Sequence, residues 1–388
     1  MKYKLKDVFD LQMGKTPSRH NVAYWGGNNK WISIADIGNA SKYIYKTKET
    51  ISDLAIEESG IKIVPTGTVI MSFKLSIGKT CITSEDMYTN EAIMAFVDKG
   101  VCPIDVDYFY HFCCGRNWSV GTNKAVLGLT LNKATLSEVE IDIPNIEAQR
   151  KIAQKLDSID DLIKFRRQEL DILEQIVKSR FIEMFGEPES NHLHWAMLPL
   201  EKCLTVLGGY AFKSEEFKTS GVPVLRIGNI NTGVFTPTNM VYWAEDASLE
   251  RYQVLPGDLV ISLTGTVGKD DYGNVCILGN AYPLYYLNQR NAKLILGESL
   301  NKHYLSELLK FSQIKKKLTG ISRGVRQANI SNRDILNLVV PIPPIELQTQ
   351  FSAFVEQTDK SKFYIIQTQK IIELLIRAIQ YKTKEVLL

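Results

Sequence analysis

Two stretches of the chain place apolar residues at the spacing of a long amphipathic helix. Within residues 144–185 they recur at alternating intervals of four and three, interrupted at Arg166 and Arg180. The stripe consists of Ile152, Leu156, Ile159, Ile163, Leu170, Leu173, Val177 and Met184. Alternating 4–3 spacing is the heptad pattern of helices that pack side by side. It predicts a helix of roughly 40 residues, about 60 Å long.

Residues 343–384 repeat this pattern more weakly, with polar residues at three of the apolar places. The corresponding positions are Phe351, Val355, Thr358, Lys362, Ile365, Gln369, Ile372, Ile376 and Ile379. The alternative is that each helix packs independently on a domain of its own. A rod of this length exceeds what one small domain covers, so pairing of the two helices as a coiled-coil-like hairpin is favoured. Gly186 and Pro188 are expected to end the first helix.

A short phrase opens both helices. The sequences IPNIEAQRKI at 143–152 and IPPIELQTQF at 342–351 share Pro, Ile, Glu and Gln at an offset of 199 residues. The shared positions include Pro144 and Pro343, Glu147 and Glu346, and Gln149 and Gln348. Proline suits the first turn of a helix, where its missing N–H would have no partner in any case. A fixed offset over such a length indicates an internally duplicated chain.

The remaining segments consist of short alternating apolar runs bounded by Gly, Pro, Asn and Asp, as in TVIMSF and DLVISL. Such runs predict strands, and helices are expected near 105–115 and 300–318. The predicted fold class is α+β. It has two strand-rich α/β domains, separated by two long helices that pair as an antiparallel coiled-coil-like spacer, with an internal pseudo-twofold repeat. The predicted domains are 1–143, 144–186, 187–342 and 343–388.

Composition adds little beyond the class of protein. The chain has 388 residues, 45% of them hydrophobic, and a formal net charge of +3, so any nucleic-acid surface must be a local patch or be shared with partners. Its six cysteines form no CxxC pair, which favours reduced thiols and no metal site. Neither a signal region nor a membrane-length apolar run is present. These features predict a soluble cytoplasmic protein.

Catalytic motifs are missing from the sequence. SIGKT at 76–80 ends like a phosphate-binding loop, but Phe73 stands where that motif needs its first glycine. HExxH, GxSxG and GxGxxG do not occur. The sequence therefore indicates a recognition subunit whose catalysis lies on another chain.

Basic, amide and aromatic side chains gather in predicted loops, where they fit nucleic-acid contacts. Lys and Arg supply affinity for phosphates, whereas Arg and Gln can read base edges. Simpler alternatives are a lysine-rich helix end that complements the helix dipole, hairpin turns, and aromatic residues at the rim of a core. The candidates in the first half are Lys15, Thr16, Trp25, Lys74, Ser76, Lys79, Arg116, Asn123 and Lys124. Those in the second half are Tyr210, Lys213, Thr264, Thr266, Lys269, Gln289, Arg290, Asn291, Lys316, Arg323, Arg326 and Gln327.

The duplicated phrase, the GDLVIS…GTVGK stretch, the GKTPS…YWGG…W opening and the order of variable and repeated regions carry a resemblance. Over essentially its whole length, the chain resembles the DNA-specificity subunit of type I restriction–modification systems. The resemblance implies two target-recognition domains, each reading one half of a split, asymmetric DNA site, with the helices setting the gap. It also implies a subunit without catalytic activity of its own.

The resemblance further implies partners and cofactors held elsewhere. Two modification subunits would bring S-adenosylmethionine and adenine-N6 methylation, and two restriction subunits would bring ATP, Mg²⁺ and cleavage. The phrase residues Pro144, Glu147, Gln149, Pro343, Glu346 and Gln348 are the predicted partner-docking and spacer motif. The alternatives are a scaffold protein that does not bind DNA, and a specificity subunit that serves a fused methylase–nuclease.

Overall fold

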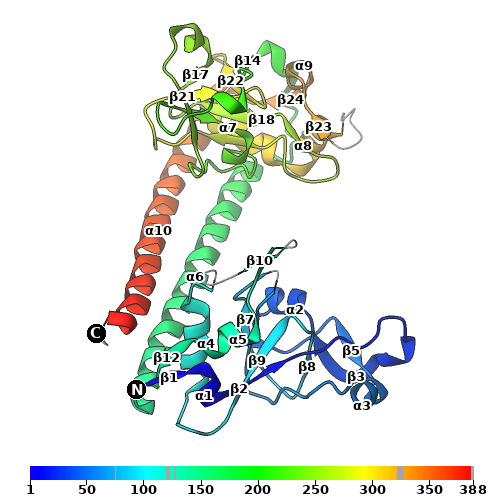
Figure 1. Ribbon diagram of the computed structural model, residues 1–388. Helices are drawn as coiled ribbons and strands as arrows, with labels where there is room; N and C mark the ends of the chain where they lie inside the picture. Colours follow the sequence, from blue (N-terminus) through cyan, green and yellow to red (C-terminus); the bar gives the residue numbers. More distant parts are fainter. Residues whose placement is uncertain (75, 119–122, 126–127, 321–326, 386–388) are drawn as a thin grey trace. The chain divides into compact units, whose positions relative to one another are not determined.

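The computed structural model describes residues 1–74, 76–118, 123–125, 128–320 and 327–385 (Figure 1). The chain divides into two compact units, Met1–Arg166 with Gln367–Leu388 and Arg167–Ile366. Each of the two long helices therefore contributes one half to each unit. Among the described residues, no helix combines the length and apolarity needed to cross a bilayer.

The first unit is built on two sheets. The larger has the order β2-β9-β6-β7-β4 and consists of β2 (Phe9–Met13), β9 (Ile93–Asp98), β6 (Val69–Ser72), β7 (Thr80–Thr83) and β4 (Tyr43–Ile44). The smaller consists of β5 (Glu49–Ile51), β3 (Trp25–Ile32) and β8 (Tyr88–Thr89), with β3 and β8 parallel. Two antiparallel pairs complete the strands, namely β1 (Lys2–Lys4) with β12 (Glu140–Asp142), and β10 (Asn123–Ala125) with β11 (Gly128–Thr130). The shorter helices are α1 (Leu5–Val8), η1 (Val22–Tyr24), α2 (Ile34–Asn39), α3 (Asp53–Ser59), α4 (Val106–Gly115) and α5 (Lys133–Ser137).

The second unit repeats this plan. Its larger sheet has the order β14-β22-β18-β20, made of β14 (Leu204–Gly208), β22 (Asn291–Leu296), β18 (Leu259–Ser262) and β20 (Val275–Ile277). Its other sheet consists of β16 (Val241–Trp243), β15 (Val222–Leu225), β21 (Tyr285–Leu287) and β17 (Gln253–Val254), with β15 and β21 parallel. The remaining pairs are β13 (Ala196–Pro199) with β24 (Val339–Ile342), and β19 (Thr264–Thr266) with β23 (Gln327–Asn329). The shorter helices are η2 (Leu200–Lys202), η3 (Ser214–Glu216), η4 (Ile227–Asn229), η5 (Ala247–Tyr252), α7 (Lys302–Lys310), α8 (Ser312–Thr319) and α9 (Asn332–Leu336).

Strand order confirms the internal duplication. The run β2-β9-β6-β7 in the first unit corresponds to β14-β22-β18-β20 in the second, and each unit adds one parallel pair in its other sheet. Each unit also closes with an antiparallel pair between its first and last strand, directly before a long helix. The helices expected near 105–115 and 300–318 are α4 and the consecutive helices α7 and α8.

The two long helices are α6 (Ile146–Phe185) and α10 (Ile345–Glu385), each unbroken over its described length. Along the middle of α6, the side chains that escape full exposure are those of residues 159, 163, 166, 170, 173 and 177. Along α10 they are those of residues 358, 362, 365, 369 and 372. This is the predicted 4–3 stripe. Arg166 continues the stripe instead of interrupting it, and the polar Thr358 is buried within it, its hydroxyl donating to the Phe354 carbonyl at 2.9 Å.

Within the second unit, the end of α6 and the start of α10 run antiparallel. The Phe185 and Phe351 rings lie 5.5 Å apart, the Arg180 guanidinium lies 5.9 Å from the Phe354 ring, and Glu174 lines the same cleft as Lys362. Positions later in α6 thus meet positions earlier in α10. Gly186, with φ of 77°, ends α6 by donating its N–H to the Ile182 carbonyl at 2.8 Å, as the sequence predicted.

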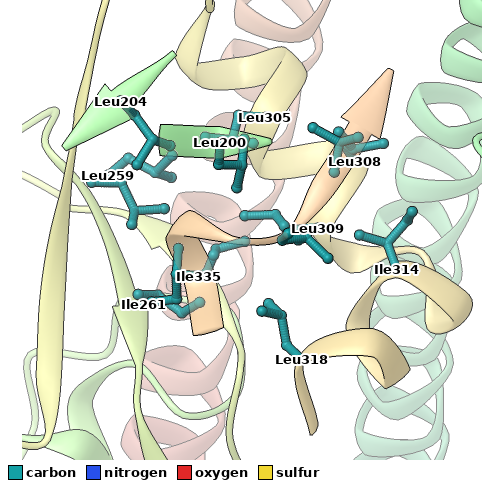
Figure 2. Close-up of a cluster of buried hydrophobic side chains, with 14 of the residues drawn as sticks. Leu200, Leu204, Leu259, Ile261, Leu305, Leu308, Leu309, Ile314, Leu318 and Ile335 are labelled. Atoms are coloured by element: carbon teal, nitrogen blue, oxygen red, sulfur yellow. The ribbon is translucent and has the colours of Figure 1, made fainter. Parts of the chain in front are cut away.

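The core of the second unit joins this helix pair to the sheet. Figure 2 shows leucines of α7 facing residues of β14 and β18, with Ile314 and Leu318 of α8 and Ile335 of α9 beside them. Phe181 of α6 is 1% exposed and stacks on Tyr304 of α7 at 5.3 Å. Because aromatic side chains bury large areas, these contacts fix the helix end rigidly to the recognition unit.

Candidate DNA interface

Three loops of the second unit meet at one end of the β14-β22-β18-β20 sheet. The Tyr210 N–H donates to the Leu287 carbonyl, the Gln289 N–H to the Tyr210 carbonyl, and the Leu263 N–H to the Arg290 carbonyl, each at 2.8 Å. The side chains of Tyr210, Gln289 and Arg290 are exposed. An aromatic ring, an amide and a guanidinium are thereby displayed from adjacent backbone, which is a set of groups suited to base edges.

The first unit has the same backbone frame. The Lys15 N–H donates to the Thr89 carbonyl at 2.8 Å, and the Phe73 N–H donates to the Ala92 carbonyl at 3.0 Å. Phe73 in turn accepts from the Leu131 N–H at 3.0 Å, as Leu263 accepts from the Ile330 N–H at 2.8 Å in the second unit. We call residues 14–16, 73–74 and 89–92, and their counterparts 209–210, 263–264 and 287–291, the reading loops.

The two sets of reading loops carry different side chains on this common frame. Matching hydrogen bonds place Lys15 where the second unit has Tyr210, and Lys74 where it has Thr264. In the same way, Glu91 corresponds to Gln289, and Ala92 to Arg290. A constant frame with changed side chains is what two recognition units for different sequences require.

Each set of reading loops depends on a glycine at a close backbone crossing. A Cβ at Gly14 would overlap the carbonyl oxygens of Thr89 and Asn90, and a Cβ at Gly209 would overlap that of Asn288. Neither position leaves room for a side chain, because the neighbour in each case is backbone and cannot rotate away.

The variant Gly209→Ala is expected to be destabilised by about 1–3 kcal/mol, because the new methyl group must push two hydrogen-bonded loops apart. The check is the free energy of unfolding, measured in urea. Gly228→Ala is the matched control, since a Cβ there meets no atom within 4 Å. Equal stabilities of the two variants would show that the crossing is not a tight constraint.

Several candidate side chains are occupied by contacts inside the protein. The Lys15 ammonium donates to the Ser59 carbonyl, and the Thr16 hydroxyl donates to Glu91. The Trp25 ring is covered by the Arg19 guanidinium, 3.8 Å from its centroid. In these places a DNA contact would have to displace an existing partner.

Further candidates are held in the same way. Thr266 donates its hydroxyl to Asp271 at 3.0 Å and its N–H to the same carboxylate at 2.8 Å, and these bonds lower the pKa of Asp271. Arg116 lies 5.4 Å from the Trp118 ring, and burial lowers its pKa. Lys213 forms an exposed ion pair with Glu216 at 3.4 Å.

The predicted base contact at Asn291 is wrong. Its side chain is 0% exposed, and its amide donates to the Leu225 carbonyl at 2.8 Å. Asn291 therefore joins β22 to the end of β15 from inside the domain. Its neighbours Gln289 and Arg290 remain exposed, as do Ser76, Lys79, Lys269 and Lys316, while Lys74 and Thr264 are half-buried. Arg323 and Arg326, and the side chains of Asn123, Lys124 and Gln327, lie outside the described residues.

The repeated glutamine of the IPNIEAQ and IPPIELQ phrases has the same three hydrogen bonds in both units. Gln149 accepts from the Asp105 N–H at 2.8 Å and donates to the carbonyls of Pro103 and Pro144, both at 2.9 Å. Gln348 accepts from the Asn301 N–H at 2.9 Å and donates to the carbonyls of Ser299 and Pro343, at 3.0 and 2.7 Å. Both side chains are 0% exposed. We call each set of three bonds a glutamine brace.

Each glutamine brace joins the first turn of a long helix to the loop before α4 or α7. It holds the recognition unit and its helix in one orientation, because three directional bonds fix the loop against the helix axis. The brace also corrects the docking prediction. The Gln149 and Gln348 side chains point into the domain and are not available to a partner, whereas Glu147 and Glu346 are exposed.

The family model for the type I restriction modification DNA specificity domain matches residues 1–175 and, a second time, residues 194–375. The chain belongs to this family. Each match runs through one set of reading loops and into the following long helix. The family's repeat thus coincides with the duplication seen in strand order and in the glutamine braces.

Curated relatives carry the same family name. The type I restriction enzyme MjaIX specificity subunit of Methanocaldococcus jannaschii is 27% identical, with 96% of this chain and 89% of that protein aligned. The EcoKI specificity subunit of Escherichia coli is 24% identical over 46% of this chain and 40% of its own length.

Solved structures of the family share the fold. A chain from a study of complex assembly and conformational transition of the type I R-M system aligns with a TM-score of 0.59 and 15% identity, covering 99% of this chain and 97% of that one. The S subunit from M. genitalium aligns with a TM-score of 0.52 and 14% identity, covering 99% and 95%. At these identities the likeness shows the fold alone.

Family membership directs attention to a second apolar surface on the long helices. Large side chains point away from the 4–3 stripe and are 39–71% exposed. They are Leu162, Phe165, Ile172 and Ile176 on α6, and Phe363, Tyr364, Ile366, Ile371 and Leu374 on α10. In the second unit, a groove of about 600 Å³ lies among Ile172, Ile176 and Phe354. Sequence reasoning missed this outer face, although its own three- and four-residue spacing was a usable signal.

Metal chemistry has no support in the described ranges. The part of the chain that the structure describes contains no group of three or more His, Cys, Asp or Glu side chains that could hold an ion. The six cysteines, all within that part, are free thiols. Burial raises the pKa of Cys81 and of Cys276 to about 12, so both are poor nucleophiles near neutral pH.

Proposed function

We propose that this chain is the DNA-specificity subunit of a type I restriction–modification assembly, with each recognition unit reading one half of a bipartite, asymmetric DNA sequence. The observation that carries the proposal is the pair of reading loops, which share one hydrogen-bonded frame and differ in the side chains displayed. A protein that reads one sequence twice would need the same side chains at both places.

The spacing between the half-sites follows from the long helices. The glutamine braces fix each recognition unit to the start of one helix, and α6 continues without a break into the second unit. We propose that α6 and α10 pair along their stripes and hold the two units at a set separation. The helix pair would then define the length of DNA between the half-sites.

The catalytic subunits would dock on the outer apolar face of the helices. Exposed large side chains at helical spacing suit the apolar faces of partner helices. Two modification subunits on this face would bring S-adenosylmethionine and adenine-N6 methylation, and two restriction subunits would bring ATP and Mg²⁺. On this proposal the chain supplies sequence selection and performs no reaction itself.

Sequencing of methylated adenines tests the proposal. Cells that produce the chain with its modification subunit are expected to methylate one two-part sequence. The variant Arg290→Ala should lose about 1–3 kcal/mol of discrimination at one position of one half-site, because a guanidinium that reads a base edge is removed.

Lys202→Ala is the matched control for this variant, since Lys202 is exposed and forms no part of the reading loops. It should leave the methylated sequence intact. Methylation at a continuous sequence, or none in the presence of an active modification subunit, would contradict the function. An unaltered sequence with Arg290→Ala would contradict only the role of that residue.

A further inference from the structure

A cleft of about 940 Å³ in the second unit is lined mainly by polar and charged side chains. Its walls are the last turns of α6, the hairpin that follows β19, the consecutive helices α7 and α8, and Lys362 of α10. Every lining residue belongs to the second unit, so the cleft is formed within one compact body.

The lining is strongly basic. It contains six lysines, and its acidic residues are Glu174, Asp270 and Glu307. This excess of three positive charges equals the formal net charge of all 388 residues. The lysines are Lys178, Lys269, Lys310, Lys315, Lys316 and Lys362. We call this feature the lysine cleft.

Half of these lysines have no carboxylate partner. Lys315 is buried against Asp270, Lys310 pairs with Glu307 at 2.9 Å, and Lys362 lies 3.6 Å from Asp359. In the described ranges, no ion pair is found for the remaining three, which are Lys178, Lys269 and Lys316. All three are exposed. Three mobile ammonium groups around one cleft form a site for a multiply charged anion.

The lysine cleft is continuous with the reading loops. Thr264 begins β19 directly after Leu263, and the same hairpin reaches the cleft at Gly268 and Lys269. A duplex whose base edges meet the reading loops therefore has its backbone close to the cleft. B-DNA supplies the matching charge, about one phosphate charge per 1.7 Å of axis.

We infer that the lysine cleft binds the phosphate backbone of the DNA next to the bases read by the second unit, and that the spacer helix α6 takes part through Lys178. The inference rests on the proposed function. It also makes the two units unequal. Among the described residues of the first unit, α4 is not followed by a counterpart of α8, the helix that carries Lys315 and Lys316.

Salt-dependent binding tests the inference. The chain in complex with its modification subunits is titrated against a labelled duplex carrying the methylated sequence, between about 50 and 200 mM KCl. The triple variant Lys178→Gln, Lys269→Gln and Lys316→Gln should flatten the slope of log K against log salt by about 2–3. The wild type should therefore lose roughly 40-fold more affinity than the variant across this range.

The control complex carries Lys2→Gln, Lys155→Gln and Lys202→Gln, three exposed positions outside the cleft. Its slope should equal that of the wild type, and both variants should methylate the same sequence. An unchanged slope in the cleft variant overturns the inference. So does weakened assembly with the modification subunits at an unchanged slope, which would identify an acidic protein surface as the occupant.

Failure of the proposed function gives a different result. If the wild-type complex methylates no two-part sequence, that proposal falls, while the slope on the same duplex still decides the cleft. Melting temperatures guard against misfolding, and the single variant Lys316→Gln, on an exposed helix position, supplies a milder version with an expected slope change of about 0.9.

Discussion

Replacing Gln348 by Leu is expected to destabilise the second unit by about 3–5 kcal/mol. Leucine has nearly the volume of glutamine, so packing is kept while all three bonds of the brace are lost. The Asn301 N–H and the carbonyls of Ser299 and Pro343 would then be left in a buried place without this partner. Each such group costs roughly 1–3 kcal/mol. Urea unfolding followed by tryptophan fluorescence measures the loss.

The control for this variant is Glu346→Gln, two residues away on the same helical turn. Glu346 is exposed, so its replacement should change stability by no more than about 0.5 kcal/mol. Gln149→Leu should reproduce the loss in the first unit, because its brace has the same bonds. Similar small effects from Gln348→Leu and Glu346→Gln would mean that the brace is not what the repeated phrase provides.

The long helices could be predicted from the sequence because their signal is local. Heptad spacing over some forty residues exceeds any competing pattern. The structure even places the polar residues Thr358 and Lys362 on the predicted stripe, where they are less exposed than their neighbours. The duplication was equally visible, since a constant offset depends only on the order of residues.

The role of the repeated phrase could not be predicted, because it depends on contacts distant in sequence. Gln149 bonds to Pro103 and Asp105, which lie 46 and 44 residues earlier. Nothing near the phrase shows that this side chain is buried. A polar residue repeated at a helix start was therefore interpreted as a surface contact.

The same limit explains the mixed outcome for the candidate DNA contacts. Gln289, Arg290 and Asn291 are consecutive polar residues, yet Asn291 begins β22 and points inward while the other two lie in the preceding loop. Sequence polarity does not report the side of the chain on which a residue falls. Likewise, Lys178 on a predicted spacer helix gave no sign of facing a cleft formed by α7, α8 and a distant hairpin.

Lengthening both helices should lengthen the recognised gap by about one turn of DNA. The insertions are three heptads between Arg166 and Arg167 and three between Ile366 and Gln367, where the two units divide. Twenty-one helical residues add about 32 Å. One turn of B-DNA is about 34–36 Å, or 10–10.5 base pairs, so the second unit would again face the same side of the duplex. Whole heptads keep the 4–3 stripes in register.

A matched variant with four residues inserted into α6 alone separates length from register. It shifts the stripe of one helix against the other, so it should weaken pairing and reduce selectivity for any single gap. Both variants keep the reading loops untouched. The bases of the half-sites should therefore be the same as in the wild type.

The most direct measurement is selection of duplexes from a library in which the two half-sites are separated by every gap up to about 20 base pairs. With three heptads in each helix, the account predicts unchanged half-sites and a preferred gap longer by about 9–10 base pairs. Selection of the wild-type gap by the lengthened protein would contradict it.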